Sequence, residues 1–121
     1  MDSNNTKHPR QGEIWLFDPD PTIGREIGKK IRPCLIFSNN VWNKIPTGLV
    51  IIIPLTSKKK SISTHVPIDL PEGGLTKESF VLCEHIRSIS RERLIKKTGE
   101  ISKKTLSKVH SWVFEILSIE N

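Results

Sequence analysis

Short apolar runs separated by turn-forming residues occupy the chain from residue 13 to residue 101. Runs of this length that are rich in Val, Ile, Leu and Phe are typical of β-strands. The run at residues 49–55 has no polar alternation, which predicts a central strand buried on both faces. Pro67 limits the run around it to the edge of a sheet. We predict strands at residues 13–17, 32–38, 49–55, 65–69, 79–89 and 94–101.

From residue 102 the apolar period lengthens to that of a helix. An apolar residue recurs every three or four positions, at Leu106, Val109, Val113, Ile116 and Leu117. This spacing predicts one apolar face of an amphipathic helix, and Ser102 is a suitable N-cap. The whole pattern predicts a mostly β, α+β fold: a small, largely antiparallel β-barrel closed by a C-terminal α-helix.

The length of the chain, 121 residues, allows one core and therefore one domain. We predict that this domain covers residues 10–121 and that the polar residues 1–9 form a disordered tail. No signal peptide is visible and no apolar run reaches the roughly 20 residues that a membrane span needs, so we expect a cytoplasmic protein. Cys34 and Cys83 lie in apolar runs and are expected to be buried thiols. The scattered histidines and cysteines predict neither a metal site nor a cofactor.

Charge and loops change this picture. The chain carries 19 Lys and Arg against 13 Asp and Glu, a net charge of +6, which attracts polyanions, although solubility alone explains many such surfaces. The loops at residues 22–31 and 56–64 follow the first and third strands. They flank one groove if those strand ends lie on the same side of the barrel. The groove would then be lined by the basic side chains of Arg25, Lys29, Lys30, Lys58, Lys59 and Lys60.

Arg32 and Thr56 are the two positions best placed for chemistry. Pro33 restricts the backbone of Arg32 to an extended geometry at a strand entry, where a guanidinium can donate a planar pair of hydrogen bonds to a phosphate. A salt bridge to Glu84 or Glu26 is the alternative role. Thr56 follows the central strand, and its hydroxyl emerges at the mouth of the sheet or hydrogen-bonds nearby backbone.

Several segments, in the same order along the chain, resemble the MazF/PemK family of toxin endoribonucleases. They are Arg10-Gln11-Gly12-Glu13-Ile14, the glycine-bearing loop that ends in Arg32-Pro33, Pro54-Leu55-Thr56-Ser57, Glu84-His85-Ile86-Arg87-Ser88-Ile89 and Arg93-Leu94. The resemblance implies an SH3-like barrel of the CcdB type and a toxin that cleaves single-stranded RNA in a sequence-selective way. It implies that Arg32 and Thr56 form the active centre. The RNA-binding residues that it implies are Arg25, Glu26, Lys29, Lys30, Ser57, Lys58, Glu84, His85 and Arg87.

We expect the RNA cleavage that the resemblance implies to need no metal, because RNA supplies its own nucleophile, the 2′-hydroxyl, beside the scissile phosphate. The general base stays unassigned: Glu84 and His85 would face opposite sides of a strand, and His85 is better explained as a half-buried structural residue. We also expect a homodimer, because the helix is apolar around most of its circumference, and an acidic antitoxin segment that binds the basic groove.

Two positions depart from the family pattern. Ile27 and His85 stand where Gln is usual, so the recognised base sequence does not follow from the resemblance. Leu82 occupies the place of a second arginine that one branch of the family uses, and a mechanism that needs this arginine does not transfer. Two alternatives remain at this stage, a non-enzymatic poison of DNA gyrase like the CcdB relatives and an inactive RNA-binding relative.

Overall fold

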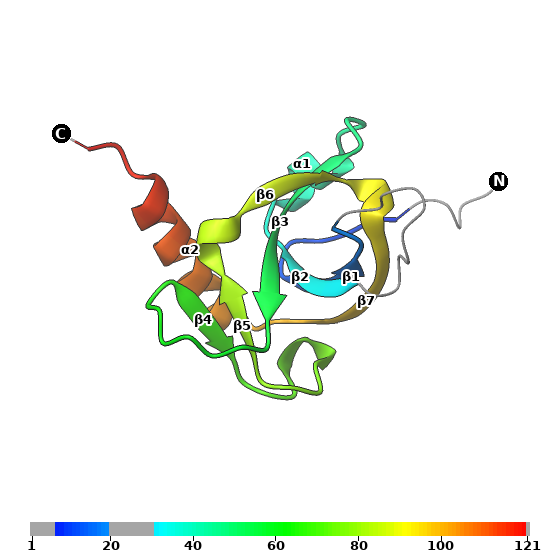
Figure 1. Cartoon of the computed structure of the whole chain (residues 1–121). Helices are drawn as coiled ribbons and strands as arrows, with labels where there is room; N and C mark the ends of the chain where they lie inside the picture. Colours follow the sequence, from blue (N-terminus) through cyan, green and yellow to red (C-terminus); the bar gives the residue numbers. More distant parts are fainter. Residues whose placement is uncertain (1–6, 20–30, 121) are drawn as a thin grey trace.

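A computed structural model of the chain describes residues 7–19 and 31–120. Within these residues, seven strands form one antiparallel sheet with the order β4-β5-β3-β2-β1-β7, and β6 pairs with β3 beside this path (Figure 1). The strands are β1 (Glu13–Phe17), β2 (Arg32–Ile36), β3 (Leu49–Thr56), β4 (His65–Ile68), β5 (Ser79–Leu82), β6 (Arg87–Ser90) and β7 (Leu94–Glu100). The helices are α1 (Asn40–Lys44) and α2 (Lys103–Leu117), with 3₁₀ turns η3 (Glu72–Gly74), η4 (Cys83–His85) and η5 (Arg91–Arg93).

Strand β3 is the centre of the fold. Its first half, from Leu49 to Ile52, pairs with β6, and its end, Leu55 and Thr56, pairs with β5. On its other side it pairs with β2. Strands β6, β3, β2, β1 and β7 curve into a ring, while β4, β5 and α2 lie to one side of it (Figure 1). The predicted fold class, mostly β with a C-terminal helix, is confirmed.

The predicted continuous strand at residues 79–89 is wrong. Strand β5 ends at Leu82, the 3₁₀ turn η4 follows, and β6 begins at Arg87. Because β3 passes from β6 to β5 between Ile52 and Leu55, the turn lies beside the middle of β3. A side chain on η4 therefore does not follow the alternation of a strand, which matters for Glu84 and His85 below.

Two apolar clusters lie on opposite faces of the central strands. One surrounds Ile53 and Leu55 and includes residues of β4, β5 and α2. The other surrounds Val50 and Ile52 and fills the ring with side chains from β1, β2, β6 and β7. Successive residues of a strand point to opposite faces, so a strand without polar alternation is buried on both. The prediction for residues 49–55 is confirmed at these positions.

Helix α2 begins at its predicted N-cap. The hydroxyl of Ser102 accepts a hydrogen bond of 3.2 Å from the backbone N–H of Thr105. The Glu72 carboxylate of η3 accepts hydrogen bonds from the Ser102 backbone N–H at 3.1 Å and from the Thr105 hydroxyl at 2.9 Å. Burial of the helix is uneven. Val109 and Val113 are buried in the core, whereas Ile116 and Leu117 are exposed, so the predicted apolar face packs on the sheet only along its N-terminal part.

Cys34 and Cys83 are buried, free thiols. Burial raises the pKa of the Cys34 thiol. Burial, reinforced by the charge of Glu84, raises the pKa of Cys83 to about 11, so both side chains are uncharged core groups at neutral pH. Over residues 7–19 and 31–120, no helix is long and apolar enough to cross a bilayer.

Candidate functional site

Arg32 and Thr56 meet at one end of the barrel. Strands β2 and β3 are antiparallel, with Cys34 opposite Pro54. Continuing this register to the end of both strands sets Arg32 opposite Thr56, with both side chains on one face of the sheet. The two residues line a pocket of about 360 Å³. Its other residues are Pro33, Leu55, Ser57 and Lys58 beside them, and Leu75, Thr76, Lys77 and Ser79 from the segment that leads into β5.

The Arg32 side chain is exposed and, among the described residues, makes no ion pair or hydrogen bond. The predicted alternative, a salt bridge to Glu84, is absent there, because Glu84 contacts Thr64, His65 and His85 instead. Glu26, the other suggested partner, lies outside the described residues. A guanidinium with its donors directed to solvent at the edge of a pocket is suited to bind a phosphate bidentately.

The Thr56 hydroxyl accepts a hydrogen bond of 3.2 Å from the backbone N–H of Lys58. This is the local backbone contact expected for a strand-terminating threonine. The contact also orients the hydroxyl, since it occupies a lone pair and leaves the proton available for donation. Thr56 can therefore both shape the turn after β3 and donate to an oxygen atom in the pocket.

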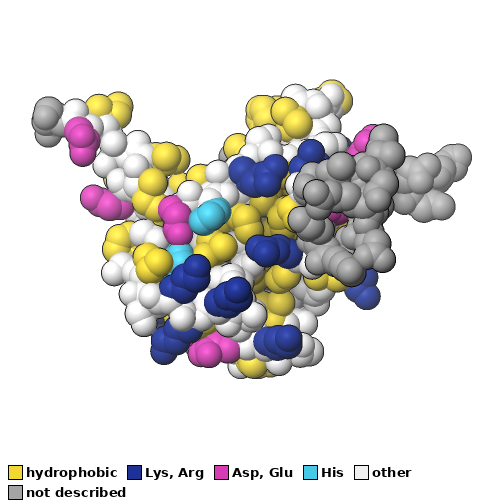
Figure 2. All heavy atoms as spheres, in the orientation of Figure 1, with side chains coloured by type: hydrophobic (Ala, Val, Ile, Leu, Met, Phe, Trp, Pro, Cys, Tyr) yellow, Lys and Arg dark blue, Asp and Glu magenta, His cyan; other side chains and the backbone are white. Residues whose placement is uncertain are grey.

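The sheet face that carries Arg32 and Thr56 continues across β5, β4 and β6, beyond the edge of β3 that does not pair with β2. Phe80 of β5 lies opposite Thr56, and Pro67 of β4 lies opposite Phe80. Arg87 of β6 is paired with Ile52, so the register places it on the same face. Figure 2 shows Lys and Arg side chains gathered on this side of the molecule, around the end of β3 and the strands next to it, with histidine and acidic side chains beside them.

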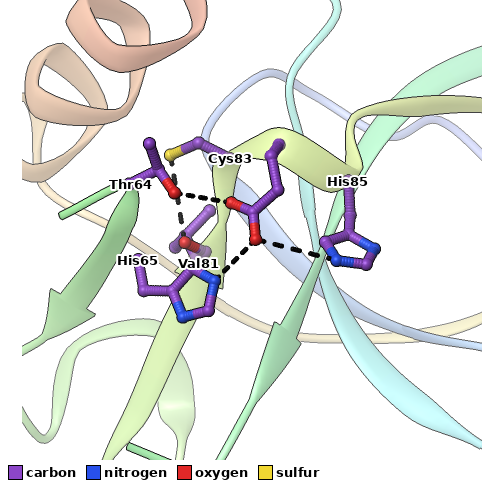
Figure 3. Close-up of polar contacts among 6 residues, drawn as sticks. Thr64, His65, Val81, Cys83 and His85 are labelled. Carbon is purple, nitrogen blue, oxygen red and sulfur yellow. Dashed lines mark hydrogen bonds and ion pairs between the residues drawn. The ribbon is translucent and has the colours of Figure 1, made fainter. Parts of the chain in front are cut away.

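Glu84 and His85 lie on the turn η4 and do not face opposite sides. Oε2 of Glu84 is 3.7 Å from Nε2 of His85 and 2.6 Å from Nε2 of His65, so the carboxylate sits between two imidazole rings (Figure 3). The His85 side chain is 59% exposed, and the prediction of a half-buried residue is wrong. The reason is the break between β5 and β6, which frees both side chains from strand alternation.

The electrostatics of Glu84 follow from these contacts. Partial burial raises the pKa of its carboxyl, but hydrogen bonds from Thr64 at 2.7 Å and from His65 outweigh burial and lower the pKa to about 2. Sequence reasoning missed His65, because its partner is far away in the chain and the four histidines form no motif. It also missed Lys77, whose only signal in the sequence is its charge.

The predicted basic residues are not all brought to this pocket. Lys58 and Ser57 line it, whereas Lys59 and Lys60 line a separate hollow of about 310 Å³ next to His65 and Phe80. Four further predicted contacts lie outside the described residues: Arg25, Glu26, Lys29 and Lys30. Of the two loops that we expect to line the groove, the structure therefore describes in full only the one that follows β3.

Comparison with known proteins agrees with this arrangement. Residues 10–117 match the family model of the PemK-like, MazF-like toxin of type II toxin-antitoxin systems. The endoribonuclease EndoA of Bacillus subtilis is 33% identical over 83% of this chain and 86% of its own length. The endoribonuclease MazF of Staphylococcus saprophyticus is 37% identical over 84% of this chain and 85% of its own length. A solved MazE–MazF structure from Deinococcus radiodurans superposes with a TM-score of 0.73 and 26% identity, covering 94% of this chain and all of that one.

The family model spans both halves of the pocket, the Arg32 end of β2 and the Thr56 end of β3, as well as the turn η4 and the whole of α2. Of these, the sequence resemblance had singled out the segments that contain Arg32, Thr56 and the turn η4. The chain belongs to the PemK-like, MazF-like family of toxins of type II toxin–antitoxin systems.

Proposed function

We propose that this toxin is an endoribonuclease that cleaves single-stranded RNA at the pocket formed by Arg32 and Thr56, without a metal ion. One observation carries the proposal: among the described residues, an exposed guanidinium without a protein partner stands opposite a hydroxyl that is oriented by backbone. The curated relatives are endoribonucleases, which supports the same activity here and does not favour a poison of DNA gyrase.

The reaction needs few groups from the protein. The 2′-oxygen of the RNA attacks phosphorus, a new P–O bond forms, and the bond to the 5′-oxygen breaks. The proton of the 2′-hydroxyl is lost to a base, and the 5′-oxygen takes up a proton. An arginine guanidinium is not deprotonated in proteins, so the role of Arg32 is to stabilise the extra charge on the phosphorus oxygens. The Thr56 hydroxyl donates a hydrogen bond to a non-bridging oxygen of the phosphate.

RNA contacts follow from the position of the pocket on the sheet. Ser57 and Lys58 lie within it, and Arg87 lies on the same sheet face further along β3. Glu84 and His85 lie on η4, at the side of the same strand. The contacts proposed for the preceding loop, Arg25, Glu26, Lys29 and Lys30, rest on the sequence resemblance. Because the proposed substrate is RNA, we propose that the protein acts in the cytoplasm.

Cleavage is tested by incubating the purified protein with a long, weakly structured RNA in the presence of EDTA. Discrete fragments support the proposal. Intact RNA with an arrest of DNA gyrase would select the non-enzymatic alternative. RNA binding without cleavage would select an inactive relative. The Arg32→Ala variant is the control for contaminating ribonuclease, because a contaminant retains its activity in that preparation.

The C-terminal part of α2 supports a homodimer. Phe114 is 74% exposed and Leu117 is 62% exposed, and together with Val113 and Ile119 they line an apolar groove. An apolar surface of this kind on a small domain is typical of an interface, and a second copy of the chain is the occupant that we propose. Sedimentation should show a dimer at micromolar concentration, and Phe114→Asp should shift it toward the monomer. A wild-type monomer under these conditions contradicts the proposal.

An acidic antitoxin segment is the second proposed partner. The related structure from Deinococcus radiodurans is a MazE–MazF complex. The Lys and Arg side chains that suit phosphates also suit carboxylates, so such a segment inhibits by occupying the RNA face. RNA and an inhibitory acidic segment should therefore compete for binding. An inhibitor that binds while RNA stays bound would show that the segment occupies another surface.

A further inference from the structure

The Glu84 carboxylate joins a buried imidazole to an exposed one. Its Oε2 atom lies 2.6 Å from Nε2 of His65, whose side chain is 6% exposed, and 3.7 Å from Nε2 of His85, which faces solvent. Its Oε1 atom accepts a hydrogen bond from the Thr64 hydroxyl (Figure 3). One carboxylate is therefore shared by two histidines from different elements, β4 and η4.

Protonation of these two histidines sets the charge of the cluster. The lowered pKa of Glu84 keeps its carboxylate ionised throughout the range in which imidazoles titrate. With both rings neutral the cluster is negative, with one ring protonated it is neutral, and with both protonated it is positive.

The pH-dependent charge of the cluster does not come from other charged groups around η4. Neither β3 nor β5, which flank the turn, contains an ionisable residue. Cys83 stays a neutral thiol, and an arginine such as Arg87 of β6 is not deprotonated in proteins. Helix α2 packs against η4, but within the described part of the chain none of its ionisable residues forms an ion pair with Glu84 or His85. These residues are Lys103, Lys104, Lys108, His110 and Glu115.

The cluster lies beside the proposed path of the RNA. Turn η4 sits next to the segment of β3 between Ile52 and Leu55. Ile52 is paired with Arg87 of β6, and Leu55 is paired with Val81 of β5. At about 3.3 Å per residue, the turn is about 3 to 13 Å along the strand from Thr56. An RNA strand with its scissile phosphate at Arg32 can thus bring a neighbouring phosphate to His85.

We propose that His85 is a proton-linked phosphate contact of this toxin and that Glu84, anchored by Thr64 and His65, positions it. The proposal rests on the proposed RNA-cleaving function and adds the mode of RNA binding. A protonated imidazole donates a charge-assisted hydrogen bond to a phosphate oxygen. A neutral His85 leaves the cluster one charge more negative beside the RNA. RNA binding is therefore coupled to the uptake of a proton, and it tightens as the pH falls.

The test measures the dissociation constant of a short, fluorescein-labelled 2′-O-methyl RNA of mixed sequence, which the enzyme cannot cleave. Titrations of the full chain run from about pH 8 to about pH 5.5 at constant ionic strength. We expect the wild type to bind about three- to fivefold more tightly at the acidic end, the upper part of the range typical of an exposed ion pair. His85→Gln keeps a hydrogen-bonding side chain that does not titrate and should lose this response. His8→Gln, which removes another exposed histidine, should keep it.

Glu84→Gln tests the positioning role. A glutamine still accepts a hydrogen bond from His65 but does not stabilise a proton on His85, so the midpoint of the pH response should move to lower pH. Thermal melts establish that each variant is folded. A response retained by His85→Gln overturns the proposal, and its loss in His65→Gln as well would assign the titrating group to His65. An unshifted midpoint in Glu84→Gln overturns the positioning role.

The result of this binding test is independent of the result of the cleavage test for the proposed function. A protein that shows the proton-linked binding but does not cleave RNA in EDTA contradicts the endoribonuclease and leaves this inference intact. A protein that cleaves RNA but binds the uncleavable RNA equally at all pH values contradicts this inference alone.

Discussion

Replacing Arg32 with alanine removes the only positive charge that strands β2 and β3 bring to the proposed active centre. The side chain is exposed and has no ion pair or hydrogen bond within the part of the chain that the structure describes, so its loss leaves the packing unchanged. Surface substitutions of this kind change the free energy of unfolding by about 0.5 kcal/mol or less. Any large loss of activity is then a loss of chemistry.

The magnitude follows from the charge that the guanidinium would face. Two unit charges about 4 Å apart interact with about 4 kcal/mol at an effective dielectric constant of about 20. A barrier raised by that amount slows the reaction about 10³-fold, the upper end of the loss measured when one preorganised donor is removed from an active site, about 10²–10³. We therefore expect Arg32→Ala to reduce the rate of cleavage about 10²- to 10³-fold.

The assay is single-turnover cleavage of a short RNA that contains one cleavage site, with thermal melts on the same preparations. Arg32→Lys should recover little activity, because an ammonium group does not reproduce the planar pair of donors. Lys58→Ala is the matched control from the same pocket: it should weaken RNA binding and its salt dependence while changing the rate at saturation much less. Cleavage at nearly the wild-type rate by a folded Arg32→Ala protein would refute this assignment of the site.

Four further measurements test other parts of the molecule. Thr56→Val removes the hydroxyl that Lys58 orients and should slow single-turnover cleavage by less than Arg32→Ala does, so an unchanged rate would exclude a catalytic hydroxyl. Ser102→Ala removes the N-cap of α2 and should lower the free energy of unfolding by about 1 kcal/mol in urea titrations. Because the folded-state pKa of Glu84 is depressed to about 2 from its ordinary 4.5, its contribution to stability is present above about pH 4.5 and is lost as the pH falls toward 2. The melting temperature of Glu84→Gln should therefore fall less over that interval than that of the wild type. Gly74→Ala should destabilise the fold more than Gly48→Ala, because both have positive φ but only at Gly74 would the new Cβ lie 2.0 Å from a backbone oxygen, that of Thr98; equal losses in urea would rule out the clash as the cause.

Several features were predictable from the sequence, because they are local. The run at residues 49–55 contains no polar alternation, and such a strand has a stable place only where both faces are covered. Helix α2 begins directly after its N-cap Ser102, because a hydroxyl that caps the first N–H groups and an apolar period of three or four residues both act within a few residues. The proximity of Arg32 and Thr56 was expected from the motifs, and the register of β2 and β3 is the feature that produces it.

Other features depend on which segments, far apart in the chain, come into contact. The local pattern of apolar and polar residues carries no information on these contacts. The turn η4 interrupts an apolar run that by itself favours a single strand, since β3 changes partner at this level of the sheet. The contact of Glu84 with His65 exists because β4 and β5 pair in one register, with His65 opposite Leu82. The period of α2 likewise marks its apolar face but not the point at which the sheet beneath it ends, and this is why Val113 is buried and Leu117 is exposed. The sequence by itself thus determined most of the elements and the chemical types at the site, whereas the pairing of strands across the sheet decided where the strand predicted at residues 79–89 breaks, which side chains share a charge and which apolar surface stays open for a partner.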